Sequence, residues 1–201
     1  MHRGRPRGCA LVLAAALTLL GTTAHAEWPY DYARSAYGRS HFYLGGGPSV
    51  VLVLRQSGPR PLLSDGAGFR FTLGGRLGRH FGMEFTWSPS FHHHDPDYFG
   101  RLFGLMRLTT LSVDGKFYPL RGPIQPFVLF GGGAYLLGDR FSLIAGGPGY
   151  QLGGGIDFWL SRHVSLGVTA QYRGALVFES LYSGVSYLGL FTGSLDVTGR
   201  F

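Results

Sequence analysis

The sequence predicts an all-β fold, an eight-stranded antiparallel up-and-down transmembrane β-barrel with a packed polar interior. Three observations lead to this prediction. The chain begins like a secreted protein, eight later segments alternate between apolar and polar residues, and only 14% of its 201 residues are charged, against about 25% in ordinary soluble domains. After the secretory start, no apolar run approaches the roughly 20 residues of a membrane-spanning helix, so a chain this apolar would cross a bilayer as strands.

Residues 1–26 predict a cleaved secretory signal peptide. Three arginines between residues 3 and 7 precede an apolar run over residues 10–20, and Ala-His-Ala at 24–26 gives small residues at the two cleavage-determining positions. The single cysteine, Cys9, lies inside this segment. We therefore expect the mature chain to use neither disulfides nor thiolate chemistry.

We assign residues 27–40 to a periplasmic lead-in and residues 41–201 to the barrel. Eight segments with period-two alternation, each bounded by turn residues, make up the barrel. They are residues 41–54, 67–78, 81–91, 104–120, 126–138, 150–161, 164–176 and 187–201. The connections after the even-numbered segments are short and the others are longer. Short turns at one end and longer loops at the other are typical of outer-membrane barrels, whose loops face outward.

Most segments present one apolar side and one polar side. In the seventh segment Leu166 and Val168 share one side, while Ser165 and Thr169 share the other. We assign the apolar sides to lipid and the polar sides to the barrel interior. The central stretches of the first and fifth segments are mostly apolar or glycine, so their faces stay unassigned.

The polar sides carry charges of both signs. Four acids and five bases lie on them: Glu84, Asp114, Asp157, Asp196, Arg70, Arg76, Lys116, Arg173 and Arg200. Eight strands make a barrel about wide enough for its own side chains to fill. We therefore expect ion pairs that plug the interior, because unpaired charges there would be costly. In the alternative, a soluble lipocalin-like carrier, the apolar sides would instead line a ligand cavity.

Two long stretches carry a family resemblance. FYPLRGPIQPFVLFGGGAYLLG and YQLGGGIDFWLSRHVSLGVTAQYRG, followed by a last strand ending in GRF, resemble the OmpA/OmpX-like superfamily of small eight-stranded outer-membrane barrels. The resemblance implies that the last strand, with its terminal aromatic Phe201, is recognised by the outer-membrane assembly machinery. It also implies outer-membrane lipid and lipopolysaccharide as surroundings.

Two histidine patterns are candidate sites of chemistry. His92, His93 and His94 open the run HHHDPD, whose imidazoles and carboxylates suit divalent zinc, nickel or copper, but adjacent histidines point apart on an extended chain. His163 and Ser165 have the spacing of the base and nucleophile in outer-membrane lipid A deacylases. That pair falls in a predicted periplasmic turn, far from the outer leaflet. We assign neither a metal site nor a catalytic site.

We expect an integral outer-membrane protein with a structural or surface-interaction role, without enzymatic activity or cofactor. An extracellular ligand would bind through the longer loops. Without residues 1–26 the formal charge falls from +7 to +4 and is spread along the chain without a basic cluster, so we expect no nucleic-acid partner. Three alternatives stay open: a narrow channel, a lipid-modifying enzyme using His163 and Ser165, and the lipocalin-like carrier.

Overall fold

The computed structural model describes residues 40–57, 63–93, 105–138, 143–179 and 184–201. The predicted signal peptide and residues 27–39 of the predicted lead-in lie outside the described residues. Within the described part of the chain, no helix is long and apolar enough to cross a membrane.

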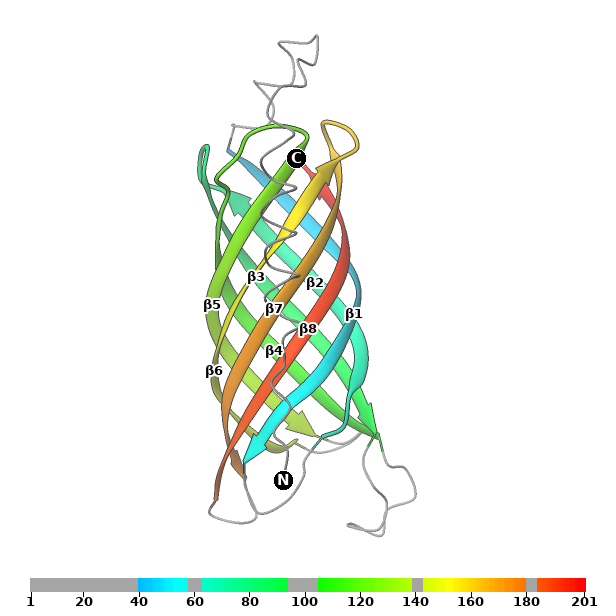
Figure 1. Ribbon diagram of the computed structural model, residues 1–201, viewed down its shortest axis with the longest axis vertical. Helices are drawn as coiled ribbons and strands as arrows, with labels where there is room; N and C mark the ends of the chain where they lie inside the picture. The colour runs from blue at the N-terminus through cyan, green and yellow to red at the C-terminus, as the bar shows by residue number, and fades with distance from the viewer. Residues whose placement is uncertain (1–39, 58–62, 94–104, 139–142, 180–183) are drawn as a thin grey trace, which may run out of the picture. The chain divides into compact units, whose positions relative to one another are not determined.

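Eight strands form one closed barrel in chain order, and every neighbouring pair is antiparallel (Figure 1). The strands are β1 (His41–Ser57), β2 (Gly66–Arg76), β3 (Phe81–His93), β4 (Leu105–Phe117), β5 (Ile124–Gly138), β6 (Leu143–Trp159), β7 (Val164–Glu179) and β8 (Val185–Arg200). β1 pairs with β8 as well as with β2. Because the barrel is closed, no strand edge is left unpaired. A β-sheet in a lipid bilayer requires this, since its backbone N–H and C=O groups find no water there. The predicted fold class is confirmed.

Most of the strands reach further toward the longer connections than the sequence predicts. β6 begins at Leu143 rather than at residue 150, so most of the predicted loop at 139–149 is strand. The cluster Gly146, Gly147, Pro148 and Gly149 has the composition of a turn. Ladder pairing with β5 overrides this local preference, since Gly146 pairs with Leu136. The other boundaries lie within three residues of their predicted positions.

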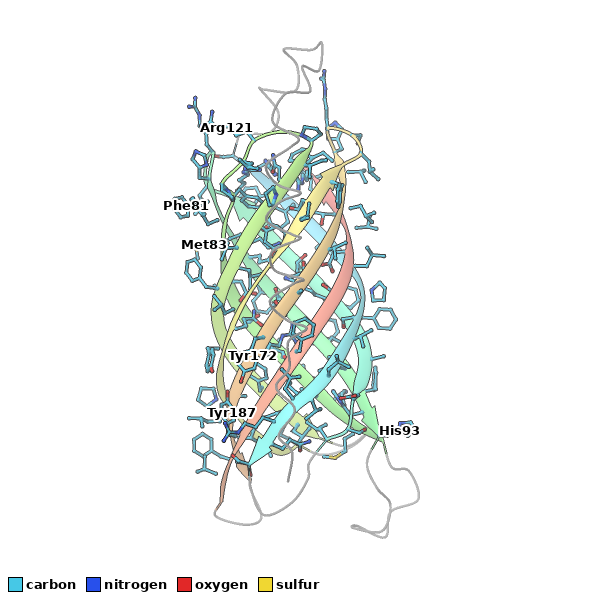
Figure 2. All side chains as sticks on the ribbon, viewed as in Figure 1. Phe81, Met83, His93, Arg121, Tyr172 and Tyr187 are labelled. Carbon is cyan, nitrogen blue, oxygen red and sulfur yellow. The ribbon has the colours of Figure 1, made fainter. Side chains whose placement is uncertain are left out.

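The predicted faces of the strands are confirmed. Phe81 and Met83 project away from the barrel wall (Figure 2), and Val168 is 47% exposed while the adjacent Thr169 is buried. All nine predicted interior charges are buried. The lipocalin-like alternative is wrong, because the apolar sides of the strands face outward and do not line a cavity.

The structure also shows which sides of β1 and β5 face the interior, which the sequence leaves open. In β1, Ser49 and Val51 are buried, while Val50 and Leu52 are exposed. Apolar residues therefore occupy both sides of this strand, and the interior cannot be polar along its whole length. The short turns lie at the end of the barrel opposite the longer connections. In one of these turns Gly78 has a φ of 92°, which glycine adopts without strain.

Candidate functional site

An ion cluster around Glu84 lies in the half of the interior near the short turns. Its carboxylate lies 2.6 Å from the Arg70 guanidinium and 2.8 Å from the Lys116 ammonium. The Tyr43 hydroxyl donates to the same carboxylate at 3.2 Å. Arg70 also reaches Asp196 at 3.5 Å. These five side chains come from β1, β2, β3, β4 and β8, so the cluster links five strands across the lumen.

Asp114 forms a second buried group, without a basic partner within salt-bridge distance among the described residues. Thr86 and Ser112 donate hydroxyl hydrogen bonds to it at 3.0 Å each, and the Gln151 amide donates a third. A Cβ atom at Gly131 would collide with Asp114, so glycine is required opposite this group.

A third polar group lies near the short turns. The Arg200 guanidinium is 3.4 Å from the Asp157 carboxylate and 3.4 Å from the ring centroid of Trp159. Tyr118, just beyond the end of β4, donates to Asp157 at 3.4 Å and lies under Arg76 at 4.3 Å. Burial raises the pKa of the Tyr118 hydroxyl to about 12.

The interior near the longer connections is apolar, which the sequence does not predict. One continuous cluster of buried residues fills it: Val51, Leu63, Met106, Leu108, Tyr135, Leu137, Ala145, Ala175, Val177, Leu188 and Leu190. We name this cluster the apolar layer. The prediction of a polar interior therefore holds mainly for the half near the short turns, and the other half is filled mostly by apolar side chains, with His92 and Ser90 buried among them.

Arg173 lies where the two halves meet. Its side chain is 1% exposed, and among the described residues no carboxylate lies within 4.0 Å of it. With its amide oxygen turned toward Arg173, Gln171 accepts hydrogen bonds from the guanidinium. Of the five predicted interior bases, Arg70, Lys116 and Arg200 have a carboxylate partner at ion-pair distance.

The histidine run is divided by the barrel wall. His92 is buried inside, where its ring nitrogens lie 2.8 Å from the Ser90 hydroxyl and 2.7 Å from the Ser64 carbonyl. His93 projects outward at the end of β3 (Figure 2). His94 and the carboxylates at 95 and 97 lie outside the described residues. Within the described part of the chain, no group of three potential ligands could hold a metal ion.

His163 and Ser165 are not brought together. His163 is exposed in the short turn between β6 and β7, where its Nδ1 lies 3.3 Å from the Arg200 carbonyl. Ser165 is buried and faces the lumen. No hydrogen bond joins the two side chains in this described turn, so the arrangement lacks the base-to-nucleophile contact that nucleophilic catalysis uses.

Comparisons with known proteins show the same fold. No protein-family model matches the chain, and no curated protein sequence matches it. Among solved structures, Neisserial surface protein A is 14% identical, with a TM-score of 0.60 over 80% of this chain and 97% of that one. OprG from Pseudomonas aeruginosa is 14% identical, with a TM-score of 0.58 over 82% and 97%. A major outer membrane protein from Thermus thermophilus is 13% identical, with a TM-score of 0.53 over 81% and 100%.

These likenesses show that the chain has the fold of small outer-membrane barrels. The outward apolar side chains supply the chain's own reason for a membrane, since large side chains such as Phe85 and Leu195 are 47% and 46% exposed on the barrel surface. Fold and surface together confirm the prediction of a transmembrane β-barrel.

Proposed function

We propose that this outer-membrane barrel is closed inside by its own side chains and serves a structural or surface-interaction role. The observation that carries the proposal is the filled lumen. Ion clusters occupy the half near the short turns, and the apolar layer occupies the half near the longer connections. A protein without a water-filled path acts through its surface. The surfaces available are the lipid-facing wall and the longer connections.

Conductance distinguishes this role from that of a narrow channel. We expect the purified protein to give no discrete conductance steps in planar bilayers. A matched variant with Leu188→Ala and Leu190→Ala removes two buried side chains of the apolar layer and serves as the partly opened comparison. Discrete steps from the unaltered protein would refute the closed interior and support the channel alternative.

The enzyme alternative has its own test. His163→Ala and Ser165→Ala should leave the lipid A acyl pattern of expressing cells unchanged, because the two side chains do not meet. Ser186→Ala is a matched control, since Ser186 is also buried on the lumen side but lies at the other end of the barrel. Loss of a deacylated species in both His163→Ala and Ser165→Ala, but not in the control, would refute the non-enzymatic role.

Assembly is the second part of the proposal. The Phe201 side chain is 82% exposed, and its backbone N–H donates to the Phe42 carbonyl at 2.9 Å. The aromatic ring at the end of the last strand is therefore free to be recognised by the outer-membrane assembly machinery. Phe201→Ala should lower the amount of protein in the outer-membrane fraction. Phe42→Ala, which removes a neighbouring ring that is 75% exposed, should lower it less.

A further inference from the structure

A polar cluster lies on the lipid-facing surface where β6, β7, β8 and β1 follow one another around the barrel. The Tyr187 hydroxyl lies 2.6 Å from the Tyr172 hydroxyl and 3.3 Å from the Tyr150 hydroxyl. Tyr172 and Tyr187 are seen on this side of the barrel, toward the end with the longer connections (Figure 2). Hydrocarbon offers hydroxyl groups no hydrogen-bond partner, so three clustered hydroxyl groups indicate that this part of the wall meets polar groups.

Arg55 joins this cluster because of a β-bulge. Along β1, Val51 faces inward and Leu52 outward, so strict alternation would turn Arg55 into the apolar layer. The register shifts between Val53 and Arg55, and Arg55 is exposed instead. The Asp65 carboxylate accepts a hydrogen bond from the Val53 backbone N–H at 2.7 Å, which stabilises the bulge. Bulges commonly re-aim a side chain in this way.

Gly189 is the point around which the cluster converges. It pairs with Arg55 across the β1–β8 ladder. A Cβ atom at Gly189 would lie 2.9 Å from the Tyr172 hydroxyl, 3.4 Å from the Tyr187 ring and 3.5 Å from the Arg55 Cβ. The missing side chain therefore lets the arginine and the tyrosines approach one another on the outer surface.

The cluster lies near the end of the membrane-crossing span that is closer to the longer connections. A membrane strand needs about 9 to 11 tilted residues to cross the hydrocarbon. Counted from the short-turn end, this length ends near Leu52 on β1 and near Phe191 on β8, and Arg55 and Tyr187 come just beyond those residues. Tyrosines are favoured at this boundary because one end of the ring is apolar and the other is polar.

The chemistry of the cluster selects an anionic, hydroxyl-rich ligand. Three phenol groups carry three protons, and the two contacts between hydroxyls use two of them. One phenol proton and the guanidinium of Arg55 are then available to donate outward. Arginine recognises phosphate through paired N–H groups, and the hydroxyl oxygens can accept from sugar hydroxyls.

We propose that Arg55, Tyr150, Tyr172 and Tyr187 form a binding site for the phosphorylated sugar headgroup of a lipid in the outer leaflet. The site rests on the proposed outer-membrane placement and gives the lipid-facing wall a specific partner. Its acyl chains would lie along the apolar surface below the cluster, where Phe191 and Leu52 are 38% and 41% exposed.

Lipid binding to the purified, full-length protein in detergent micelles tests the site. The probes are bisphosphorylated lipid A, the same lipid A without phosphates, phosphatidylglycerol and inorganic phosphate, each titrated and followed by native mass spectrometry. We expect bisphosphorylated lipid A to bind at least about tenfold more tightly than each other probe, and Arg55→Gln to remove about tenfold of that affinity. Tyr172→Phe should cause a smaller loss.

Arg107→Gln is the matched control. Arg107 is exposed on the outer side of β4 and, like Arg55 in β1, is the third residue from the strand end at the longer connections, but it lies away from the three tyrosines. The Arg107→Gln variant loses the same charge as Arg55→Gln, and its affinity for lipid A should equal that of the unaltered protein. Each variant is first shown to be folded by its faster migration on unheated SDS gels.

Three results would overturn the site. They are equal binding by Arg55→Gln and the unaltered protein, an equal loss in Arg107→Gln, and displacement of lipid A by inorganic phosphate, which would show a small-anion site instead. If phosphatidylglycerol bound as tightly as lipid A, the site would not recognise the sugar, and the proposed phosphorylated sugar ligand would be wrong. Because the assay is performed in micelles, its failure leaves the conductance and fractionation tests of the proposed function unaffected.

Discussion

The two halves of the barrel interior are closed by opposite chemistry. Near the short turns, Glu84 holds Arg70 and Lys116 at 2.6 and 2.8 Å, so closure depends on specific charged partners. Near the longer connections, the apolar layer closes the same bore mainly by the packing of apolar side chains. An ion cluster fixes which strands must meet, because each charge needs its partner. An apolar plug tolerates exchange among side chains of similar volume.

The first prediction breaks the charged half. Glu84→Gln leaves Arg70 and Lys116 buried together without their shared carboxylate, and we expect the free energy of unfolding to fall by about 3 to 5 kcal/mol. Urea unfolding of the barrel in lipid vesicles, followed by tryptophan fluorescence, measures the loss. Combining the change with Lys116→Met should cost less than the sum of the single variants. A loss below about 0.5 kcal/mol, the usual size for a surface change, would contradict the cluster's role.

The second prediction breaks the apolar half. Leu137 is 1% exposed in the apolar layer, whereas its neighbour Leu136 faces outward. Leu137→Ala should lower the free energy of unfolding by about 2 to 5 kcal/mol, because it leaves a cavity. Leu136→Ala should cost less, since lipid can fill the space. Equal losses in the same unfolding assay would mean that the layer is not tightly packed.

The third prediction compares two depths on the lipid-facing wall. Val168 and Val185 are both exposed on the barrel wall, at 47% and 58%, but Val185 is the first residue of β8 at the end with the longer connections. Val168→Arg should cost about 2 to 4 kcal/mol, and Val185→Arg about 0 to 1 kcal/mol. The yield of folded barrel on unheated gels and the unfolding free energy both report the difference. The reverse order would place the membrane boundary elsewhere.

The smallest effect is expected at Arg173, where the two halves meet. Because no carboxylate among the described residues pairs with it, replacing Arg173 with Met removes a costly buried charge and adds apolar volume next to the apolar layer. We expect a change within about 1 kcal/mol. Arg70→Met, which strips Glu84 of a partner at 2.6 Å, is the comparison and should cost several times more. Similar losses would reveal an ionic partner of Arg173.

The charged half could be predicted from the sequence because its residues alternate with apolar ones. Arg70 stands between Phe69 and Phe71, and Asp114 follows Val113, so period two alone places each charge opposite the lipid side. The partners of these charges could not be predicted. The contact of Glu84 with Lys116 depends on the β3–β4 register and on side-chain reach across the lumen.

The apolar half escaped prediction because its side chains have the same chemistry as those that face lipid. Val50, Val51 and Leu52 are all apolar, and period two cannot say which of them points inward. The outer cluster escaped for a different reason. The bulge that turns Arg55 outward depends on pairing with β8 and on Asp65, neither of which leaves a pattern in the residues next to Arg55.

Because β1 pairs with β8, the barrel can close only after the last strand has been synthesised. Gly46 meets Val197, so the first strand keeps one side without a partner until the last strand has been synthesised and delivered. Before β8 is in place, the sheet is open, and its unpaired edge strand can pair with other chains. A closed sheet is therefore exposed to pairing with other chains until its first and last strands meet.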